Sequence, residues 1–233
     1  SSGKPKGIVR SHRRLLSSAR STINFAHLCP DDRLIALTKL SFGGRDLLRS
    51  LLCGAAVFPF DIQKDGVLDL VRLLKSERIT CYQSVPSIFR SVVRTFEETD
   101  RFPFIRLLQL GGELLYRSDV DAYRKHFPDE CILTNRLSAG EAGNLCVFFV
   151  DKSTKIDSPI VPVGYPVEGK TILLLNHEGE RIGVNETGEI AVRSRNLSSG
   201  YWKDPDLTDA RFRTDLITGE RIYLTGDLGK ILP

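Results

Sequence analysis

Short apolar runs alternate with helix-like patterns between residues 33 and 134. The runs are rich in Val, Ile, Leu and Phe, and several end at Gly, Pro or Asp, which is typical of β-strands. Strands are predicted at residues 33–37, 56–60, 79–83, 105–110 and 131–134. Between the second and third run, residues 66–78 place Val67, Leu70 and Leu74 on one helix face, which predicts a helix.

The alternation predicts a doubly wound α/β fold. After Pro86, the apolar residues Ile88, Val92 and Phe96 repeat the helical spacing, so that strand and helix patterns follow each other several times. Parallel strands need crossover connections of this kind, and the crossover helices cover both faces of the sheet. We therefore expect a mostly parallel sheet with helices on both faces.

The pattern changes after about residue 143, where short strands and turn residues replace the helical spacing. Strands are predicted at residues 145–150, 160–163, 170–175 and 188–193. The polar tract 176–180 between the last two is typical of a hairpin turn. We expect an α/β domain over residues 1–143, followed by a small antiparallel β-sheet or barrel over residues 144–233.

Composition and charge narrow the class of protein. The 233 residues are 41% hydrophobic and 27% charged, which excludes a disordered chain. The formal net charge is +4 and the basic residues are dispersed, so we expect no nucleic-acid partner. No apolar stretch approaches the ~18 residues of a membrane-spanning helix, so no membrane partner is expected. Five widely spaced cysteines, with no His/Cys pair at metal-ligand spacing, indicate reduced thiols and a cytoplasmic protein.

The first seven residues, Ser-Ser-Gly-Lys-Pro-Lys-Gly, have the chemistry of an anion-binding loop. Ser1, Ser2 and Gly3 offer hydroxyl and backbone donors. Lys4 and Lys6 offer the positive charge that a triphosphate needs. The spacing differs from that of a Walker loop, and a stretch of this composition taken alone is more often a flexible tail.

Polar residues also follow two predicted strands. Gly111 and Gly112 come after residues 105–110 and, with Glu113, open a predicted helix. Paired glycines at the carboxyl end of a parallel strand allow close contact with a ring, although a tight turn explains them equally well. Residues 135–141 follow the strand at 131–134, and they supply an amide, a hydroxyl and a carboxylate.

Each of these groups suits part of a nucleotide. The amide of Asn135 can read a base edge, and the carboxylate of Glu141 can hold Mg²⁺ beside phosphates. Asp227, in a predicted turn at 223–228, can accept both hydroxyls of a ribose. A single Gly-Asp pair, however, is usually only a turn.

The order of the motifs resembles the adenylate-forming superfamily, and most of all the adenylation domains of nonribosomal peptide synthetases. The motifs are residues 1–7, Gly111 to Glu113, Asn135 to Glu141, Gly188 to Ile190 with Gly200 to Trp202, and Tyr223 to Leu228. The resemblance covers essentially the whole chain. It implies that a carboxylic acid substrate attacks the α-phosphorus of ATP, that pyrophosphate leaves, and that a carrier-protein phosphopantetheine thiol takes the acyl group. It also implies Mg²⁺ as a cofactor and neighbouring synthetase domains as partners.

The resemblance assigns roles to individual residues. The triphosphate loop maps to Ser1, Ser2, Gly3, Lys4 and Lys6, of which the two lysines share the catalytic role with Glu141. The other nucleotide contacts map to Gly111, Gly112, Glu113, Asn135, Leu137, Ser138, Ala139, Gly140 and Asp227. Among them, Asn135 is expected to contact adenine and Asp227 the ribose, while Glu141 binds Mg²⁺. The acyl pocket maps to Phe42, Gly43 and Gly44.

The chain departs from the family pattern at three positions. Leu137 replaces a Tyr that stacks on adenine, and Gly140 replaces a Thr that contacts phosphate, which lowers the expected nucleotide affinity. Gly43 replaces the Asp that pairs with an α-ammonium group. Because a buried ammonium without a partner is costly, the pocket favours another carboxylic acid, such as a keto, hydroxy, aryl or acyl acid, unless Asp46 supplies the missing carboxylate.

The chain also has no counterpart of the family's mobile lid domain with its Lys, of the hinge, or of the amino-terminal part of the core. We therefore expect the chain by itself to bind nucleotide poorly and to catalyse little. The alternative to an adenylating enzyme is a degenerate, non-catalytic module that serves as a scaffold or docking surface in a larger synthetase.

Overall fold

The computed structural model describes residues 6–37 and 44–233, which form two compact units. The α/β unit comprises Ala19–Leu137 and Cys146–Tyr165, and the β-rich unit comprises Ser1–Ser18, Ser138–Leu145 and Pro166–Pro233. This division differs from the expected boundary between residues 143 and 144. The reason is that the amino-terminal strand pairs with a strand near residue 200, so that segments far apart in the sequence belong to one unit.

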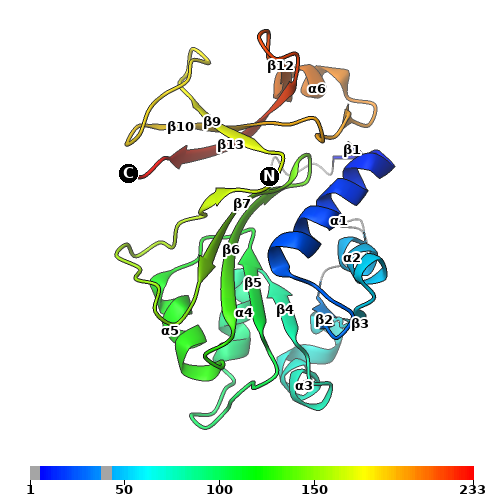
Figure 1. Cartoon of the computed structure of the whole chain (residues 1–233), viewed down its shortest axis with the longest axis vertical. Helices are drawn as coiled ribbons and strands as arrows, with labels where there is room; N and C mark the ends of the chain where they lie inside the picture. Colours follow the sequence, from blue (N-terminus) through cyan, green and yellow to red (C-terminus); the bar gives the residue numbers. More distant parts are fainter. Residues whose placement is uncertain (1–5, 38–43) are drawn as a thin grey trace. The chain divides into compact units, whose positions relative to one another are not determined.

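A mixed, mostly parallel sheet of seven strands runs through the α/β unit in the order β3-β2-β4-β5-β6-β7-β8 (Figure 1). The strands are β2 (Arg33–Ala36), β3 (Ala56–Pro59), β4 (Cys81–Ser84), β5 (Leu107–Gly111), β6 (Ile132–Ala139), β7 (Gly143–Val150) and β8 (Tyr165–Pro166). All the pairs from β3 to β6 are parallel, which confirms the predicted fold class. The predicted strand at 160–163 is wrong, since Ile160 forms only an isolated bridge to Tyr116.

Helix α1 (His12–Ala26) precedes β2, and four helices connect the strands from β2 to β6: α2 (Arg45–Cys53), α3 (Ile62–Ser76), α4 (Pro86–Val93) and α5 (Arg117–His126). The ends of α3 and α4 follow local rules, because the Asp61 side chain accepts the Gln63 N–H at the start of α3 and Pro86 occupies the first turn of α4. The sequence analysis did not predict α1. No helix in the described part of the chain is long and apolar enough to cross a membrane.

Alternating side chains on the strands build a core on each face of the sheet. Leu108 on β5 packs in a cluster with residues of α3, α4 and α5, among them Val120 and Tyr123. The preceding residue, Leu107, packs on the opposite face with Leu34 and Ala26, the last residue of α1. The sheet is therefore covered by helices on both sides, as the doubly wound pattern requires.

The β-rich unit contains the predicted antiparallel sheet. Its four strands have the order β12 (Phe212–Thr214), β13 (Arg221–Lys230), β10 (Thr187–Arg193) and β9 (Thr171–Leu175). The short helix α6 (Pro205–Arg211) precedes β12. The hairpin turn predicted at 176–180 is confirmed, because the Asn176 side chain accepts the N–H groups of Glu178 and Glu180.

Candidate functional site

Two of the predicted catalytic residues meet on one tyrosine in the β-rich unit. The Tyr201 hydroxyl donates a 2.6 Å hydrogen bond to Oε1 of Glu141. The Lys6 ammonium lies 5.7 Å from the centre of the Tyr201 ring, in a cation–π contact. Lys6, Glu141 and Tyr201, which we call the Lys-Tyr-Glu cluster, therefore join three motifs that are far apart in the sequence.

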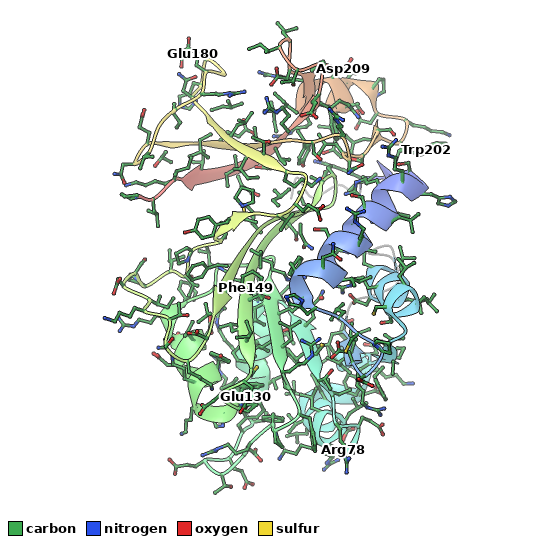
Figure 2. All side chains as sticks on the ribbon, in the orientation of Figure 1. Arg78, Glu130, Phe149, Glu180, Trp202 and Asp209 are labelled. Atoms are coloured by element: carbon green, nitrogen blue, oxygen red, sulfur yellow. The ribbon has the colours of Figure 1, made fainter. Side chains whose placement is uncertain are left out.

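Backbone pairing positions Lys6 and Tyr201. Strand β1 (Ile8–Val9) pairs antiparallel with β11 (Gly200–Tyr201), and the Trp202 N–H donates to the Gly7 carbonyl over 2.7 Å. Trp202, labelled in Figure 2, packs so closely on Gly7 that a Cβ there would lie 2.9 Å from the Trp202 Cβ. Packing therefore favours glycine at position 7, whatever the role of the loop.

Main-chain hydrogen bonds hold Glu141 in place. Its carbonyl oxygen accepts from the Ser198 N–H at 2.8 Å, the Ser198 hydroxyl at 2.9 Å and Nε of Arg14 at 3.2 Å. Arg14, which is 4% exposed, also donates to the Gly140 carbonyl at 2.7 Å. These bonds fix the backbone, so that the Glu141 side chain projects from a rigid support.

Burial keeps two tyrosines neutral, namely Tyr201 of the Lys-Tyr-Glu cluster and Tyr223. It raises the pKa of Tyr201 to about 12, and the hydrogen bond to Glu141 acts in the same direction. Burial also raises the pKa of Tyr223, which lies on β13. Tyr201 is therefore a hydroxyl donor at neutral pH, and the Tyr223 side chain also interacts with the Glu141 carboxylate.

Asp227 lies in a bulge of β13, and not in the predicted turn. The register of β13 on β10 moves from the pair Ala191 and Leu224 to the pair Glu189 and Leu228, so β13 has extra residues there. Gly226 adopts a φ of 81° within the bulge. Bulges direct side chains away from the ladder, and the Asp227 side chain is accordingly exposed.

Asn135 is buried in β6 and its amide is already partly engaged. The strand continues to Ala139, so the prediction that it ends at residue 134 is wrong. The Asn135 side-chain NH₂ donates to the carbonyls of Val161 at 3.0 Å and Pro162 at 2.9 Å. Both donors are used, which leaves Oδ1 as an acceptor. An acceptor at this position suits the exocyclic amino group of adenine.

Residues 137–140 of the same motif follow Asn135 to the end of β6 and just beyond it. Leu137 and Ala139 are half-buried and Ser138 is exposed. Gly140 follows the strand, and a Cβ there would lie 2.6 Å from Cδ1 of Ile8. The Ile8 side chain therefore occupies the space into which a threonine at residue 140 would project.

The paired glycines at the end of β5 have structural reasons. A Cβ on Gly111 would lie 2.5 Å from the Arg136 carbonyl oxygen, and Gly112 has a φ of 89°. The prediction that a helix opens here is wrong, because α5 begins only at Arg117. Glu113 instead accepts the Ser87 N–H at 2.9 Å in the first turn of α4.

Part of the predicted site lies outside the described residues, namely Ser1, Ser2, Gly3, Lys4, Phe42 and Gly43. Gly44, the remaining residue of the predicted acyl pocket, is described. It has a φ of 57° and directly precedes α2. Among the described residues, no group of three or more His, Cys, Asp or Glu is placed to hold a metal ion.

The sequence analysis missed a second cluster, which lies in the α/β unit. Arg45 and Arg49 on α2 and Arg136 on β6 lie close enough for Arg45 to lower the pKa values of both other arginines. Asp46, which the sequence analysis considered as a partner for a substrate ammonium, instead forms an ion pair with Arg49.

The α/β unit also has a cavity of about 360 Å³ at the amino ends of β5 and β6. Its walls include Arg106, Leu107, Ile132 and Phe149, the last of which is labelled in Figure 2. Ligands of open α/β sheets bind at the carboxyl ends of the strands. The cavity is at the other ends, so we do not place the predicted site there.

Three features together are typical of adenylate-forming ligases: a doubly wound sheet, a small antiparallel sheet and motifs in this order. A family model for AMP-binding enzymes matches residues 1–202, so the chain belongs to the AMP-binding enzyme family. The nonribosomal peptide synthetase FmoA3 has a TM-score of 0.90 and 28% identity to this chain, and the match covers 98% of this chain and 25% of that chain. That synthetase has also been solved with AMPPNP bound.

Curated relatives are much longer than this chain. Gramicidin S synthase 2 from Brevibacillus brevis is 29% identical over 100% of this chain and 5% of that protein. Tyrocidine synthase 3 from Brevibacillus parabrevis is 30% identical over 99% of this chain and 4% of that protein. The chain thus spans only a small part of the synthetases that it matches.

Proposed function

We propose that this chain is part of an adenylation domain that activates a carboxylic acid for nonribosomal peptide or hybrid polyketide biosynthesis. A carboxylate oxygen of the substrate attacks the α-phosphorus of ATP, the bond to the β-phosphate oxygen breaks, and pyrophosphate leaves. The sulfur of a carrier-protein phosphopantetheine then attacks the acyl carbon, the thiol loses its proton, and AMP leaves. The observation that carries the proposal is the Lys-Tyr-Glu cluster in a chain of the AMP-binding enzyme family.

The residues of this chain fit ATP as a substrate. Oδ1 of Asn135 is an acceptor for the adenine amino group, and the exposed carboxylate of Asp227 is an acceptor for ribose hydroxyls. Lys6 supplies positive charge for the phosphates. Pyrophosphate gains negative charge as it leaves, and a cation beside it lowers the barrier.

Glu141 fits Mg²⁺ as a single protein ligand. Its Oε1 is held by the Tyr201 hydroxyl, and its backbone carbonyl is fixed by Ser198 and Arg14, so the carboxylate projects in a defined direction. Mg²⁺ in nucleotide sites commonly takes one or two carboxylates, substrate phosphates and water. When bound, the ion would neutralise phosphate charge, and the role of this chain is to orient one carboxylate toward it.

The proposal includes partners outside this chain. The relatives are peptide synthetases of which this chain spans a small part, so we propose a carrier protein and neighbouring synthetase domains as partners. The five cysteines are free thiols, which is compatible with a reducing cytoplasm as the site of action.

The test is ATP–pyrophosphate exchange by the full-length protein that contains this chain, with a broad panel of carboxylic acids. We expect exchange with at least one acid, and a loss of roughly tenfold or more in kcat/KM for ATP in Asp227→Ala. Asp209→Ala, which changes an exposed aspartate of α6, is the matched control. No exchange with any acid, while a related synthetase is active under the same conditions, would sink the proposal.

Packing around Gly140 favours a second candidate, a non-catalytic module that docks other synthetase domains. Ile8 fills the space that a phosphate-binding threonine would need, and Leu137 cannot stack as an aromatic ring does. ATP binding measured by calorimetry separates the two functions. Binding that is lost in Asp227→Ala counts against the docking module, and absence of binding in the full-length protein supports it.

A further inference from the structure

Three arginines lie against one face of the α/β sheet at the carboxyl ends of its strands. Arg45 and Arg49 are one turn apart on α2, and Arg136 follows Thr134 by two residues on β6. Arg49 is 5% and Arg136 is 9% exposed. Arg49 reaches the sheet directly, because its guanidinium donates to Oε1 of Gln83 on β4 at 2.9 Å.

The arginines have too few negative partners. Arg49 pairs with Asp46, and within residues 6–37 and 44–233 no hydrogen bond or ion pair engages the side chain of Arg45 or Arg136. Three positive charges against one negative charge leave a formal surplus of two. Burial lowers the pKa of Arg49 to about 9 and that of Arg136 to about 10, and the neighbouring arginines add to the effect.

Unpaired donors gather on the same face. Gln109 on β5 is the register partner of both Gln83 and Thr134, so these side chains form a row across three strands. Nε2 of Gln109, Oγ1 of Thr134 and the Nε atoms of Arg49 and Arg136 are buried and have no hydrogen-bond partner within the described residues. Native structures rarely leave so many buried polar groups unpaired in one place, which points to a missing ligand.

The chemistry of the cluster selects the ligand. Guanidinium groups bind planar carboxylates through two parallel hydrogen bonds, and the amide of Gln109 adds a further donor. The surplus of positive charge repels an ammonium group. Because Arg49 and Arg136 are more than nine-tenths buried, the cluster suits a small terminal anion better than a hydrated triphosphate.

We propose that Arg45, Arg49 and Arg136 bind a second carboxylate of the acyl substrate, which makes the substrate a dicarboxylic acid. One carboxylate is adenylated, and the other is held by the arginines. The inference rests on the proposed function and on Gly44, the predicted pocket residue that directly precedes Arg45. It explains why the chain keeps a charged cluster that costs stability when no ligand is bound.

The experiment measures ATP–pyrophosphate exchange by the full-length protein with matched acids. Succinate, glutarate, 2-oxoglutarate and isophthalate are compared with butyrate, pentanoate, 2-oxopentanoate and 3-methylbenzoate, in which a methyl group replaces one carboxylate, and L-leucine represents the α-amino acids. We expect kcat/KM for the best dicarboxylic acid to exceed that for its monocarboxylic analogue by roughly a hundredfold, since a site built for a charged group rejects an analogue that lacks it.

Variants of the arginines test whether these side chains cause the preference for a dicarboxylic acid. Arg136→Gln is expected to lower kcat/KM for the best dicarboxylic acid by roughly a hundredfold and to change that for the monocarboxylic analogue by less than about threefold. Arg45→Gln, at a half-buried position, is the second variant if Arg136→Gln does not fold. Arg72→Gln, at an exposed arginine on α3, is the matched control and leaves both values unchanged.

Each other result overturns the inference. If monocarboxylic acids or L-leucine are the best substrates, the inference fails while the proposed function stands. Equal losses for both acids in Arg136→Gln, with a KM for ATP raised more than about tenfold, show that the arginines serve the phosphates. Exchange with no acid at all rejects the proposed function, and the inference with it.

Discussion

The Lys-Tyr-Glu cluster and the arginine cluster differ in how their polar groups are satisfied. In the β-rich unit, Tyr201 and Glu141 are hydrogen-bonded to each other, and Arg14 donates to two backbone carbonyls. In the α/β unit, the Nε atoms of Arg49 and Arg136 have no partner among the described residues. A satisfied network supports its own structure, whereas an unsatisfied one reduces stability until a ligand of opposite charge binds.

The comparison leads to the largest expected effect at Glu141. Glu141→Gln keeps an acceptor for the Tyr201 hydroxyl but removes the negative charge available to Mg²⁺. We expect exchange by the full-length protein to slow by roughly a hundred- to a thousandfold at saturating Mg²⁺. Glu178→Gln, in an exposed turn of the same unit, is the control. Unchanged exchange in Glu141→Gln would remove Glu141 from the proposed metal site.

Arg14 is expected to have the next largest effect, and it acts on stability. Arg14→Met removes one donor from each of the Gly140 and Glu141 carbonyls, and the Glu141 carbonyl then keeps only the two donors of Ser198. We expect local destabilisation of about 2–4 kcal/mol. Hydrogen exchange of peptides that cover residues 138–145 in the full-length protein measures it, and Arg13→Met on an exposed turn of α1 is the control. Unaltered exchange of these peptides argues against a supporting role for Arg14.

A change at Arg136 is expected to alter stability in the opposite direction to Arg14→Met, by stabilising the protein. Arg136→Met removes a buried charge that no described carboxylate neutralises, so the ligand-free protein gains about 1 kcal/mol. Slower hydrogen exchange in peptides of β5 and β6, without added acid, is the expected readout. A loss of stability instead shows that Arg136 has a structural partner, and the contrast between the two clusters then disappears.

Lys170 is expected to have an effect on stability that depends on pH. Burial, together with the nearby Arg14, lowers the pKa of Lys170 to about 8, while the unfolded chain keeps the ordinary value of about 10.4. Between these values the unfolded state binds more protons, so this residue makes stability rise with pH.

Lys170→Met tests whether Lys170 makes stability rise with pH. We expect the variant to be more stable than the parent below pH 8 and the difference to shrink as the pH approaches about 10. Burial raises the pKa values of Cys81, Cys131 and Cys146, which makes stability fall with pH, but equally in both proteins. The difference in Tm between the two proteins, measured across this range, therefore isolates Lys170.

Local patterns predicted most of the sheet. The apolar runs at 56–60 and 105–110 are strands β3 and β5 within one or two residues. Strand β5 is buried on both faces of the sheet, which leaves a continuous apolar signal, whereas β3 lies at the sheet edge and is partly exposed. Helix α1 was missed because its sequence, HRRLLSSARSTINFA, is mostly polar. The buried Arg14 on that helix interrupts the apolar face that periodicity would detect.

The sequence predicted only those parts of the candidate site that lie within short motifs. Lys6, Glu141 and Asp227 were identified by residue type and order, but Asp227 was placed in a turn, whereas a bulge of β13 presents it. Asn135 was predicted to contact adenine through its amide, whereas the two bonds of that amide to the 161–162 carbonyls became visible only in the folded structure. A propensity for turns cannot tell a loop from a bulge when both contain Gly and Asp.

The sequence by itself determined the alternation of strands and helices, the later antiparallel sheet and the order of the motifs, because each depends on residues that are neighbours along the chain. Only the tertiary structure decided that Lys6 and Glu141 meet on Tyr201, and that Arg45, Arg49 and Arg136 share one face with unpaired donors. Those groupings depend on strand register and on how α2 packs against the sheet. Contacts of this kind join distant segments, and no local pattern records them.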